Sequence, residues 1–188
     1  MSSVLVSGVL ILALNYVSFW LNFTSHMAKE IDFPITPAVR VLKQAKISFT
    51  PHLYDYVEKG GTEVAAESLG VSEHLVVKTI VLEDENKQPL MVLIHGDKQV
   101  STKKLGRILS KRSIIPCSPD TVTKHTGYLV GGTSPLGSKK SLPVYIEESV
   151  MELSVMYLNG GKRGFLVGVN PKQIKDLINA QIVSVSQD

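Results

Sequence analysis

The sequence predicts a single domain of the mixed α/β class, built on a curved mixed sheet with flanking helices. Capping residues followed by apolar residues at helical spacing alternate with short runs of β-branched residues, and no repeat or low-complexity linker interrupts this order. The chain has 188 residues, of which 44% are hydrophobic. That is enough for one domain with a sizeable core and too little for two.

The first half of this domain is predicted to contain two capped helices and a hairpin. Thr36 precedes a proline, the usual order of a capping residue and a first helical residue. One face of the helix that follows would carry Ala38, Val41, Leu42 and Ala45. The next expected elements are a strand at 52–56, a helix capped by Thr62 and ended by Gly70, a strand at 76–82, a turn at 83–87 and a strand at 90–94.

The second half continues the alternation of helices and strands. Ser101 is expected to cap a helix that runs to Ser110, and Ser118 is expected to cap another. A turn is expected at 159–161, because Asn-Gly-Gly is a strong turn signal. The remaining elements are strands at 114–115, near Val144, at 155–158 and at 165–169, and a helix after Asn170-Pro171 with Ile174, Leu177 and Ile178 on its inner face.

The first 26 residues differ in character from the rest. Residues 4–23 carry no charge and are about long enough to cross a bilayer as a helix, so a membrane anchor is one interpretation. The other is that Met27 is the working start. We favour the second, which makes residues 1–26 an apolar N-terminal extension and 27–188 the functional domain.

Charge and cysteine content limit the classes of function. Lys and Arg number 20 against 17 Asp and Glu, so the net charge of +3 permits a polyanionic partner without requiring one. The single cysteine, Cys117, excludes an intramolecular disulfide and a cysteine-rich zinc site. We therefore expect a protein of a reducing compartment, the cytoplasm, with no metal and no cofactor.

Two features of the sequence suggest a binding site. Residues 127–137, GYLVGGTSPLG, contain four glycines, which permit φ > 0 and let a ligand approach the main chain. The stretch is neither a P-loop nor a dinucleotide fingerprint, and a purely structural role in turns stays open. Lys78 lies in a strand whose two faces both look buried, so it must snorkel to solvent, pair with an anion or face a pocket.

These features together resemble the YbaK/EbsC family of aminoacyl-tRNA deacylases, relatives of the editing domain inserted in bacterial prolyl-tRNA synthetases. The resemblance runs from Thr36 to the C-terminus, and it implies a barrel-like sheet. It is carried by TPAVRVL at 36–42, HLY at 52–54, VKT at 77–79, the glycine stretch and GGKRG at 160–164. Among the subfamilies the chain is most similar to those that act on Cys-tRNA(Pro), with Cys-tRNA(Cys) as a further substrate to consider.

The resemblance also implies roles for individual residues. Lys78 and Gly131 would be catalytic, because main-chain amides of the glycine loop would face the ester carbonyl, where charge develops during acyl transfer. Substrate binding would fall to Tyr54, Thr79, Gly132, Thr133, Ser134, Pro135, Asn159, Gly160 and Gly161. Contacts to tRNA phosphates would come from Lys139, Lys140, Lys162 and Arg163, and prolyl-tRNA synthetase would be a partner.

By the same resemblance no protein nucleophile is needed. The thiol of the substrate would attack its own ester, a reaction of the hydrolase or lyase type, and water would serve other amino acids. Cys117 is expected to be packed rather than reactive. The possible bases His52, His95 and His125 lie in no triad or metal-binding spacing.

Two departures from the family pattern leave the substrate open. Asn159 stands where close relatives have serine, and Leu166 stands where they have aspartate. An amide can still form hydrogen bonds, whereas a leucine side chain cannot. The alternatives are therefore a deacylase for tRNA mischarged with Ala, Pro or Ser, or a non-catalytic module that binds tRNA or the synthetase.

Overall fold

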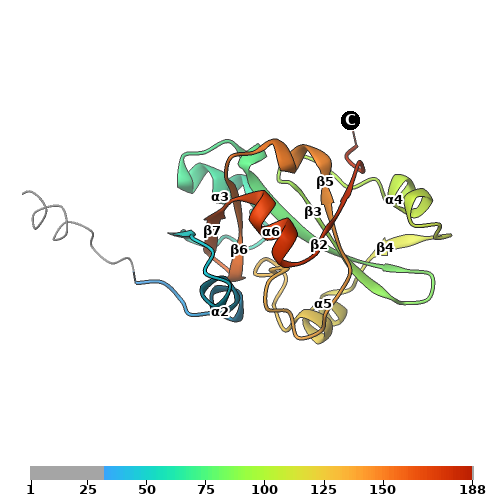
Figure 1. Cartoon of the computed structure of the whole chain (residues 1–188), viewed down its shortest axis with the longest axis horizontal. Coiled ribbons are helices and arrows are strands. Elements are labelled where there is room, and N and C mark those ends of the chain that lie inside the picture. Colours follow the sequence, from blue (N-terminus) through green and yellow to red (C-terminus); the bar gives the residue numbers. More distant parts are fainter. Residues whose placement is uncertain (1–31, 188) are drawn as a thin grey trace, which may run out of the picture. The chain divides into compact units, whose positions relative to one another are not determined.

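An eight-stranded mixed sheet is the frame of this computed structural model, which describes residues 32–187 (Figure 1). The strand order is β1-β7-β6-β2-β3-β5-β8, and β4 pairs with β2 beside this path. The strands are β1 Thr50–Leu53, β2 Val76–Asp84, β3 Pro89–His95, β4 Ile114–Pro116, β5 Val144–Glu147, β6 Met156–Lys162, β7 Phe165–Val169 and β8 Gln181–Val183. Parallel pairs (β2–β6, β3–β5, β5–β8) occur beside antiparallel ones, which confirms the predicted mixed class.

Five α-helices occur in the described part of the chain, and four of them begin where the sequence predicts. They are α2 Pro37–Gln44, α3 Gly61–Leu69, α4 Thr102–Ile108, α5 Pro119–Thr126 and α6 Pro171–Leu177, with short 3-10 helices η1 Glu73–Leu75 and η2 Glu148–Glu152. The side chains that cap α2, α4, α5 and α6 by accepting main-chain hydrogen bonds are those of Thr36, Ser101, Ser118 and Asn170.

Several predicted boundaries are wrong. Thr62 does not cap α3, because the helix already begins at Gly61, and the Thr62 hydroxyl instead donates to Glu73 Oε1 at 2.6 Å. The strand expected at 52–56 is β1, which ends at Leu53. On α2 the buried residues are Ala38, Val39 and Leu42, whereas Ala45 is exposed. Strand β8 was not predicted at all.

The predicted turn at 159–161 is also wrong. These residues lie inside β6, and the pairing with β7 shifts register between Asn159 and Lys162, which marks a β-bulge. The chain reverses only at Arg163 and Gly164, and Gly164 has φ of +75°. The Asn-Gly-Gly signal therefore reports an irregular backbone, but one that bends a strand rather than ending it.

The core lies on both faces of β2. Val77 and Val81 face the larger apolar cluster, which includes residues of α2, α5 and α6. On the other face, Val76 packs with two alanines of α3, and Leu82 packs with Leu105 of α4. Helices α3 and α4 therefore cover the same face of β2 and leave a stretch of strand between them.

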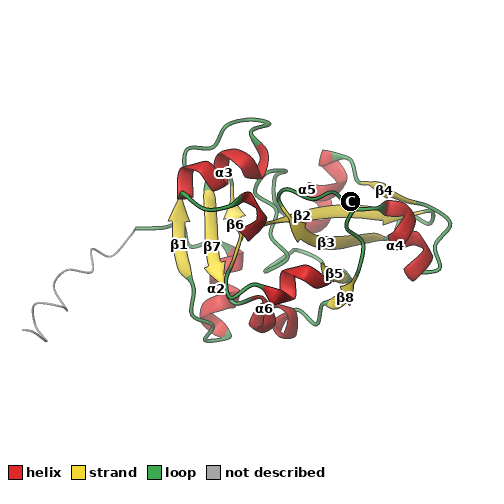
Figure 2. Cartoon of the chain, turned by 90° about the horizontal axis from the view of Figure 1, so that it is seen from above, coloured by secondary structure: helices red, strands yellow, loops and turns green. Residues whose placement is uncertain are grey.

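The sheet is strongly twisted. In Figure 2, strands β1, β7 and β6 run across the direction of β2 and β3. Phe33–Asp188 forms one unit by its contacts. The features predicted at residues 4–23 and at Met27 lie outside the described residues, and none of the helices in 32–187 could span a membrane.

Candidate active site

A cavity of about 650 Å³ opens where one edge of β2 has no partner strand. Strand β6 pairs with this edge at Val76 and Val77, and β4 pairs with it only from Leu82 onward. The Gly96 amide donates to Val76 O at 2.7 Å, and hydrogen bonding to β3 then alternates along β2. This alternation directs the main-chain groups of Thr79 to the open edge. Strand pairing thus leaves polar groups free at the cavity.

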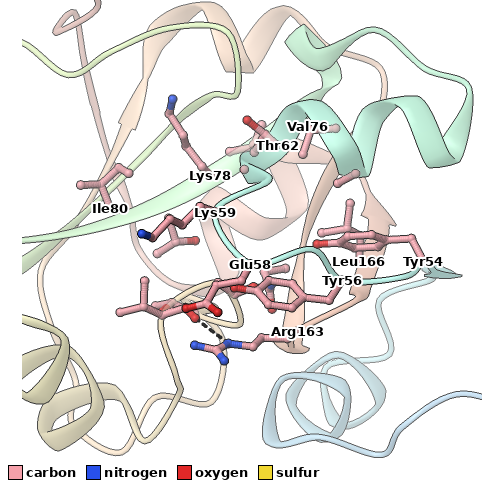
Figure 3. Close-up of a pocket in the computed structure, with 18 of the residues that line it drawn as sticks. Tyr54, Tyr56, Glu58, Lys59, Thr62, Val76, Lys78, Ile80, Arg163 and Leu166 are labelled. Carbon is pink, nitrogen blue, oxygen red and sulfur yellow. Dashed lines mark hydrogen bonds between the residues drawn. The ribbon is translucent and has the colours of Figure 1, made fainter.

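The wall of the cavity is built by segments far apart in the sequence (Figure 3). They are the 54–62 connection into α3, strand β2, the glycine stretch and the β6–β7 hairpin. Of the predicted site residues, those that line the cavity are Tyr54, Lys78, Thr79, Gly131, Thr133, Asn159 and Arg163. Those that do not line it are Gly132, Ser134, Pro135, Gly160, Gly161, Lys139, Lys140 and Lys162.

Gly131 is the glycine whose conformation the site requires. Its φ is +87°, and a Cβ atom there would lie 2.9 Å from the hydroxyl of Tyr56. Asn159 Nδ2 donates to the Gly131 carbonyl at 2.9 Å, while Asn159 Oδ1 accepts from the Gly161 amide at 2.8 Å. Asn159 therefore ties the glycine loop to the bulge in β6.

Arg163 adds a second tie between loop and hairpin. Its Nε donates to Val130 O at 2.9 Å, and its guanidinium lies over the ring of Tyr56, 5.1 Å from the centroid. This position allows a cation–π contact. The loop that presents Gly131 is thus held by two side chains of the β6–β7 hairpin.

The neighbouring glycine-loop residues serve packing. The Gly132 amide donates to Leu129 O at 2.8 Å, and a Cβ on Gly132 would lie 3.0 Å from the Arg163 amide. Ser134 has no exposed surface, and the Tyr128 hydroxyl donates to Leu136 O at 2.7 Å. The glycine stretch is therefore a folded loop that exposes only part of itself to the cavity.

Two polar groups of residues that line the cavity make no hydrogen bond within residues 32–187. One is the Gly131 amide. The other is the Thr79 hydroxyl, which is fully buried. Gly131 is exposed, so its amide can meet a ligand, whereas the Thr79 oxygen has almost no accessible surface and lies on the Val77 side of β2. The Gly131 amide, together with the main-chain groups of Thr79 at the open β2 edge, could stabilise negative charge on an oxygen of a bound ester.

Lys78 lies at one end of the cavity. Its Nζ donates to Gly96 O at 2.7 Å, and burial lowers the pKa of its ammonium group, although the nearby Glu73 and Asp97 act in the opposite direction. Figure 3 shows this ammonium far from Tyr56 and Arg163. Lys78 is therefore a tethered cation that could attract an anionic group to its own end of the cavity.

Three charged residues complete the cavity wall, and sequence reasoning missed two of them. Lys59 and Glu58 line it from the connection into α3, together with Arg163 and the ring of Tyr56. Lys59 has φ of +63°, immediately before Gly60-Gly61, so the Lys-Gly-Gly turn was the signal that could have found them. With Lys78, the wall carries three cations and one anion.

The part of the cavity beside Leu166 and Val76 is apolar, and we call it the apolar end. Leu166 is 3% exposed and packs with Ala65 and Val76. Tyr54 borders this group, and burial together with the neighbouring Tyr56 raises the pKa of its phenol above the usual value. Tyr54 is therefore a neutral hydrogen-bonding group beside an apolar floor.

The possible protein nucleophile and bases lie outside the cavity wall. Burial and the nearby Glu83 raise the pKa of the Cys117 thiol to about 11, so it is protonated at neutral pH. His52 shares a hydrogen bond with Thr50 Oγ1, and His95 is held by His74 O and Ser149 Oγ. None of these side chains is placed to attack a ligand in the cavity.

The predicted tRNA-binding residues are placed differently from one another. The amides of Lys139 and Lys140 donate to Thr126 O and His125 O at the end of α5, and both side chains are exposed. Lys162 is exposed on the hairpin without lining the cavity, and Arg163 alone lines it. Lys139 and Lys140, which follow the glycine stretch, therefore lie away from the cavity wall.

These features define a class of site, namely a cavity with unpaired main-chain groups that suit an oxyanion, an apolar end and a mostly cationic wall. Comparison with known proteins agrees with this class. The model of the aminoacyl-tRNA editing domain matches residues 58–177, and the chain belongs to this family. Hydrolysis of an aminoacyl-tRNA ester is the activity that membership indicates, whereas a lyase reaction has no support.

Individual relatives extend the comparison. A protein of Enterococcus faecalis with the provisional name Cys-tRNA(Pro)/Cys-tRNA(Cys) deacylase EbsC is 29% identical over 85% of this chain and 98% of its own. A proline–tRNA ligase of Lactobacillus johnsonii is 31% identical over 68% of this chain but only 21% of the ligase. The crystal structure of a candidate trans-editing enzyme for prolyl tRNA synthetase shares the fold, with a TM-score of 0.71, 22% identity and coverage of 82% of this chain and 100% of that chain.

Proposed function

We propose that this protein removes a wrong amino acid from tRNA(Pro), with Cys-tRNA(Pro) as its main substrate and Cys-tRNA(Cys) as a secondary one. The observation that carries the proposal is that the Gly131 amide and the main-chain groups of Thr79 at the open β2 edge are unpaired within residues 32–187 and belong to one cavity. An ester carbonyl held between them would gain hydrogen bonds as it becomes an oxyanion. The provisional name of the Enterococcus relative supports the choice of substrate.

The apolar end and the charged wall of the cavity suggest how the substrate lies. The amino-acid side chain enters the apolar end formed by Ala65, Val76 and Leu166. The terminal nucleotide then lies toward the charged wall, where Lys59 and Arg163 can meet phosphate oxygens and the ring of Tyr56 can contact the base. Lys78 holds the ribose or the terminal phosphate at the β2 edge.

The thiol of a cysteinyl ester can perform the cleavage itself. The sulfur attacks the ester carbonyl carbon, the bond from that carbon to the ribose oxygen breaks, and the thiol proton ends on the ribose oxygen. The amino acid leaves as its thiolactone, which water then opens. The protein holds thiol and carbonyl together and stabilises the oxyanion through Gly131 and Thr79, so no protein nucleophile is required.

The apolar end favours cysteine over serine. A cysteine side chain behaves as a small apolar group, whereas a serine hydroxyl placed against Leu166, Ala65 and Val76 would lose its hydrogen bonds to water. Alanine would fit the same space but brings no nucleophile, so its ester would need an attacking water. We therefore expect the order Cys, then Ala, then Ser.

The partner and compartment follow from the same proposal. Free mischarged tRNA(Pro) is produced by prolyl-tRNA synthetase, which is therefore the expected partner, and both act in the cytoplasm. Few side chains at the cavity are placed to read bases, so the synthetase would supply much of the tRNA selectivity.

The test is release of amino acid from tRNA(Pro) charged with Cys, Pro, Ala or Ser, under single-turnover conditions. Fast release of Cys, slower release of Ala and little release of Ser or Pro is expected. A second arm uses tRNA(Pro) charged with S-methylcysteine, whose methyl thioether cannot attack the ester, so release should slow strongly. Tight tRNA binding without release of any amino acid would instead identify a non-catalytic binding module and contradict the proposal.

A further inference from the structure

A second hollow, of about 300 Å³, lies on helix α4 and is lined mainly by basic residues. Between residues 98 and 119 the sequence contains six Lys and Arg and no Asp or Glu. Four of these cations line the hollow, namely Lys103, Arg107, Lys111 and Arg112. Such a concentration in a chain of net charge +3 sets this surface apart from the rest of the protein.

The charges of the hollow are only partly neutralised. Lys111 forms an ion pair with Asp84 at 2.7 Å, and the neighbouring Glu85 also acts on Lys111. Within residues 32–187, the side chains of Lys103, Arg107 and Arg112 form no ion pair, and all three residues are exposed. Three cations of the hollow are therefore available to an anionic partner.

Helix α4, which carries the hollow, and helix α3, which borders the cavity, pack on one face of β2. Helices α3 and α4 cover this face, and Ile80 between them both lines the cavity and packs against the cluster that contains Leu105 of α4. Figure 1 shows α4 toward the opposite end of the molecule from α3. Asp84, the ion-pair partner of Lys111, follows Lys78 by six residues in β2. At ~3.3 Å per residue, the distance along the strand between them is about 20 Å.

We propose that the hollow on α4 is a second binding site, which takes phosphates of the tRNA acceptor stem while the 3′ end of the same tRNA occupies the cavity. The inference rests on the proposed function. A polyanion that enters the cavity must continue past its mouth, and the free cations lie beside Lys111, whose partner Asp84 is about 20 Å along β2 from Lys78. An arginine guanidinium can donate two parallel hydrogen bonds to the oxygens of one phosphate, so Arg107 and Arg112 suit this ligand.

The test compares a variant carrying Lys103→Gln, Arg107→Gln and Arg112→Gln with a control carrying Arg40→Gln, Lys46→Gln and Lys172→Gln. The control removes the same charge at exposed positions on or next to α2 and α6. Binding of uncharged tRNA(Pro) is measured by fluorescence anisotropy over a range of salt concentrations. The hollow variant should lose on the order of 10²-fold in affinity at low salt, and its salt slope should fall by about 2 to 3, because fewer counterions are released. The control should change by less than about threefold.

A second substrate separates the failure of this inference from that of the proposed function. A cysteinylated CCA trinucleotide reaches the cavity but not the hollow, so both variants should cleave it at the wild-type rate. A protein that binds tRNA through the hollow yet cleaves no ester would support the inference and contradict the proposed function. Equal tRNA affinity of the hollow variant and the control would overturn the inference. So would a loss confined to binding of phosphatidylglycerol vesicles, which would assign the surface to a membrane.

Discussion

The two walls of the cavity use their polar groups in opposite ways. On the glycine-loop wall, the Val130 and Gly131 carbonyls and the Gly132 amide are bonded within the protein, through Arg163, Asn159 and Leu129. On the β2 wall, the strand edge is open and the Thr79 hydroxyl has no partner among the described residues. The first wall is braced so that the Gly131 amide is held in position, and the second leaves main-chain groups of Thr79 unpaired at the strand edge.

Substitutions in the two walls should therefore have different effects. A change that disturbs the braced wall should act through the position of Gly131, whereas a change on the β2 wall should remove a ligand contact directly. A substitution in the glycine-loop wall should therefore lower mainly kcat, because lost positioning affects the transition state more than the bound ground state. A substitution in the β2 wall should also weaken substrate binding.

Gly131→Ala should have the largest effect, a loss of deacylation on the order of 10²-fold or more. The added methyl group would meet the Tyr56 hydroxyl at 2.9 Å, and φ of +87° is strained for alanine. Gly70→Ala is the matched control, because Gly70 also has positive φ, +65°, but its Cβ would meet no atom within 4 Å. Both variants should lose about 1–2 kcal/mol of stability on unfolding in urea, and only Gly131→Ala should lose activity.

Lys78→Ala should reduce deacylation on the order of 10²-fold, with part of the loss in KM, because a charge that attracts the substrate disappears. The fold should persist, since the ammonium group is already poorly solvated. Lys87→Ala, at the exposed end of the β2–β3 hairpin, is the control and should keep wild-type kinetics. Wild-type kinetics of Lys78→Ala would remove this residue from the site.

Asn159→Asp should cost about tenfold in kcat, the equivalent of one hydrogen bond of about 1.4 kcal/mol. A carboxylate oxygen would replace the amide that donates to the Gly131 carbonyl, and the two oxygens would repel each other. Asn159→Ser restores a donor and should recover part of the rate. If the aspartate variant raises KM alone, Asn159 contacts the substrate instead of bracing the loop.

Cys117→Ser should have the smallest effect, less than about twofold on deacylation. Cys117 does not line the cavity, and its thiol pKa is raised to about 11 by burial. Alkylation of wild-type protein by iodoacetamide should accordingly be slow at pH 7 and accelerate only toward that pKa. A complete loss of turnover in Cys117→Ser would show that the protein supplies the nucleophile after all.

Local chemistry made much of the fold predictable. The caps Thr36, Ser101, Ser118 and Asn170 each begin a helix where expected, because a capping side chain bonds main-chain amides only two or three residues away. The turn at 159–161 failed because the same Asn-Gly-Gly chemistry suits a bulge, and only pairing with β7 decides between them.

The site was less predictable than the fold, because it depends on contacts between distant segments. Lys78 was found because it is a charged residue in an apolar strand, and the glycine stretch because it contains four glycines. The structure brings Lys78 and Gly131 to one cavity. Nothing in the local sequence could show that Gly132 packs against the Arg163 backbone, or that α4 shares a face of β2 with α3. Both contacts depend on the order in which distant strands pair in the sheet.

The most direct measurement of the central claim, that the two walls bind one ester between them, is an NMR titration of labelled protein. The ligand is the amide-linked, non-hydrolysable analogue of 3′-cysteinyl adenosine. The account predicts that the amide signals of Gly131 and Thr79 shift along one binding curve, while those of Lys139 and Lys140 remain in place. Shifts confined to either wall, or centred on the lysines after the glycine stretch, would contradict the site described here.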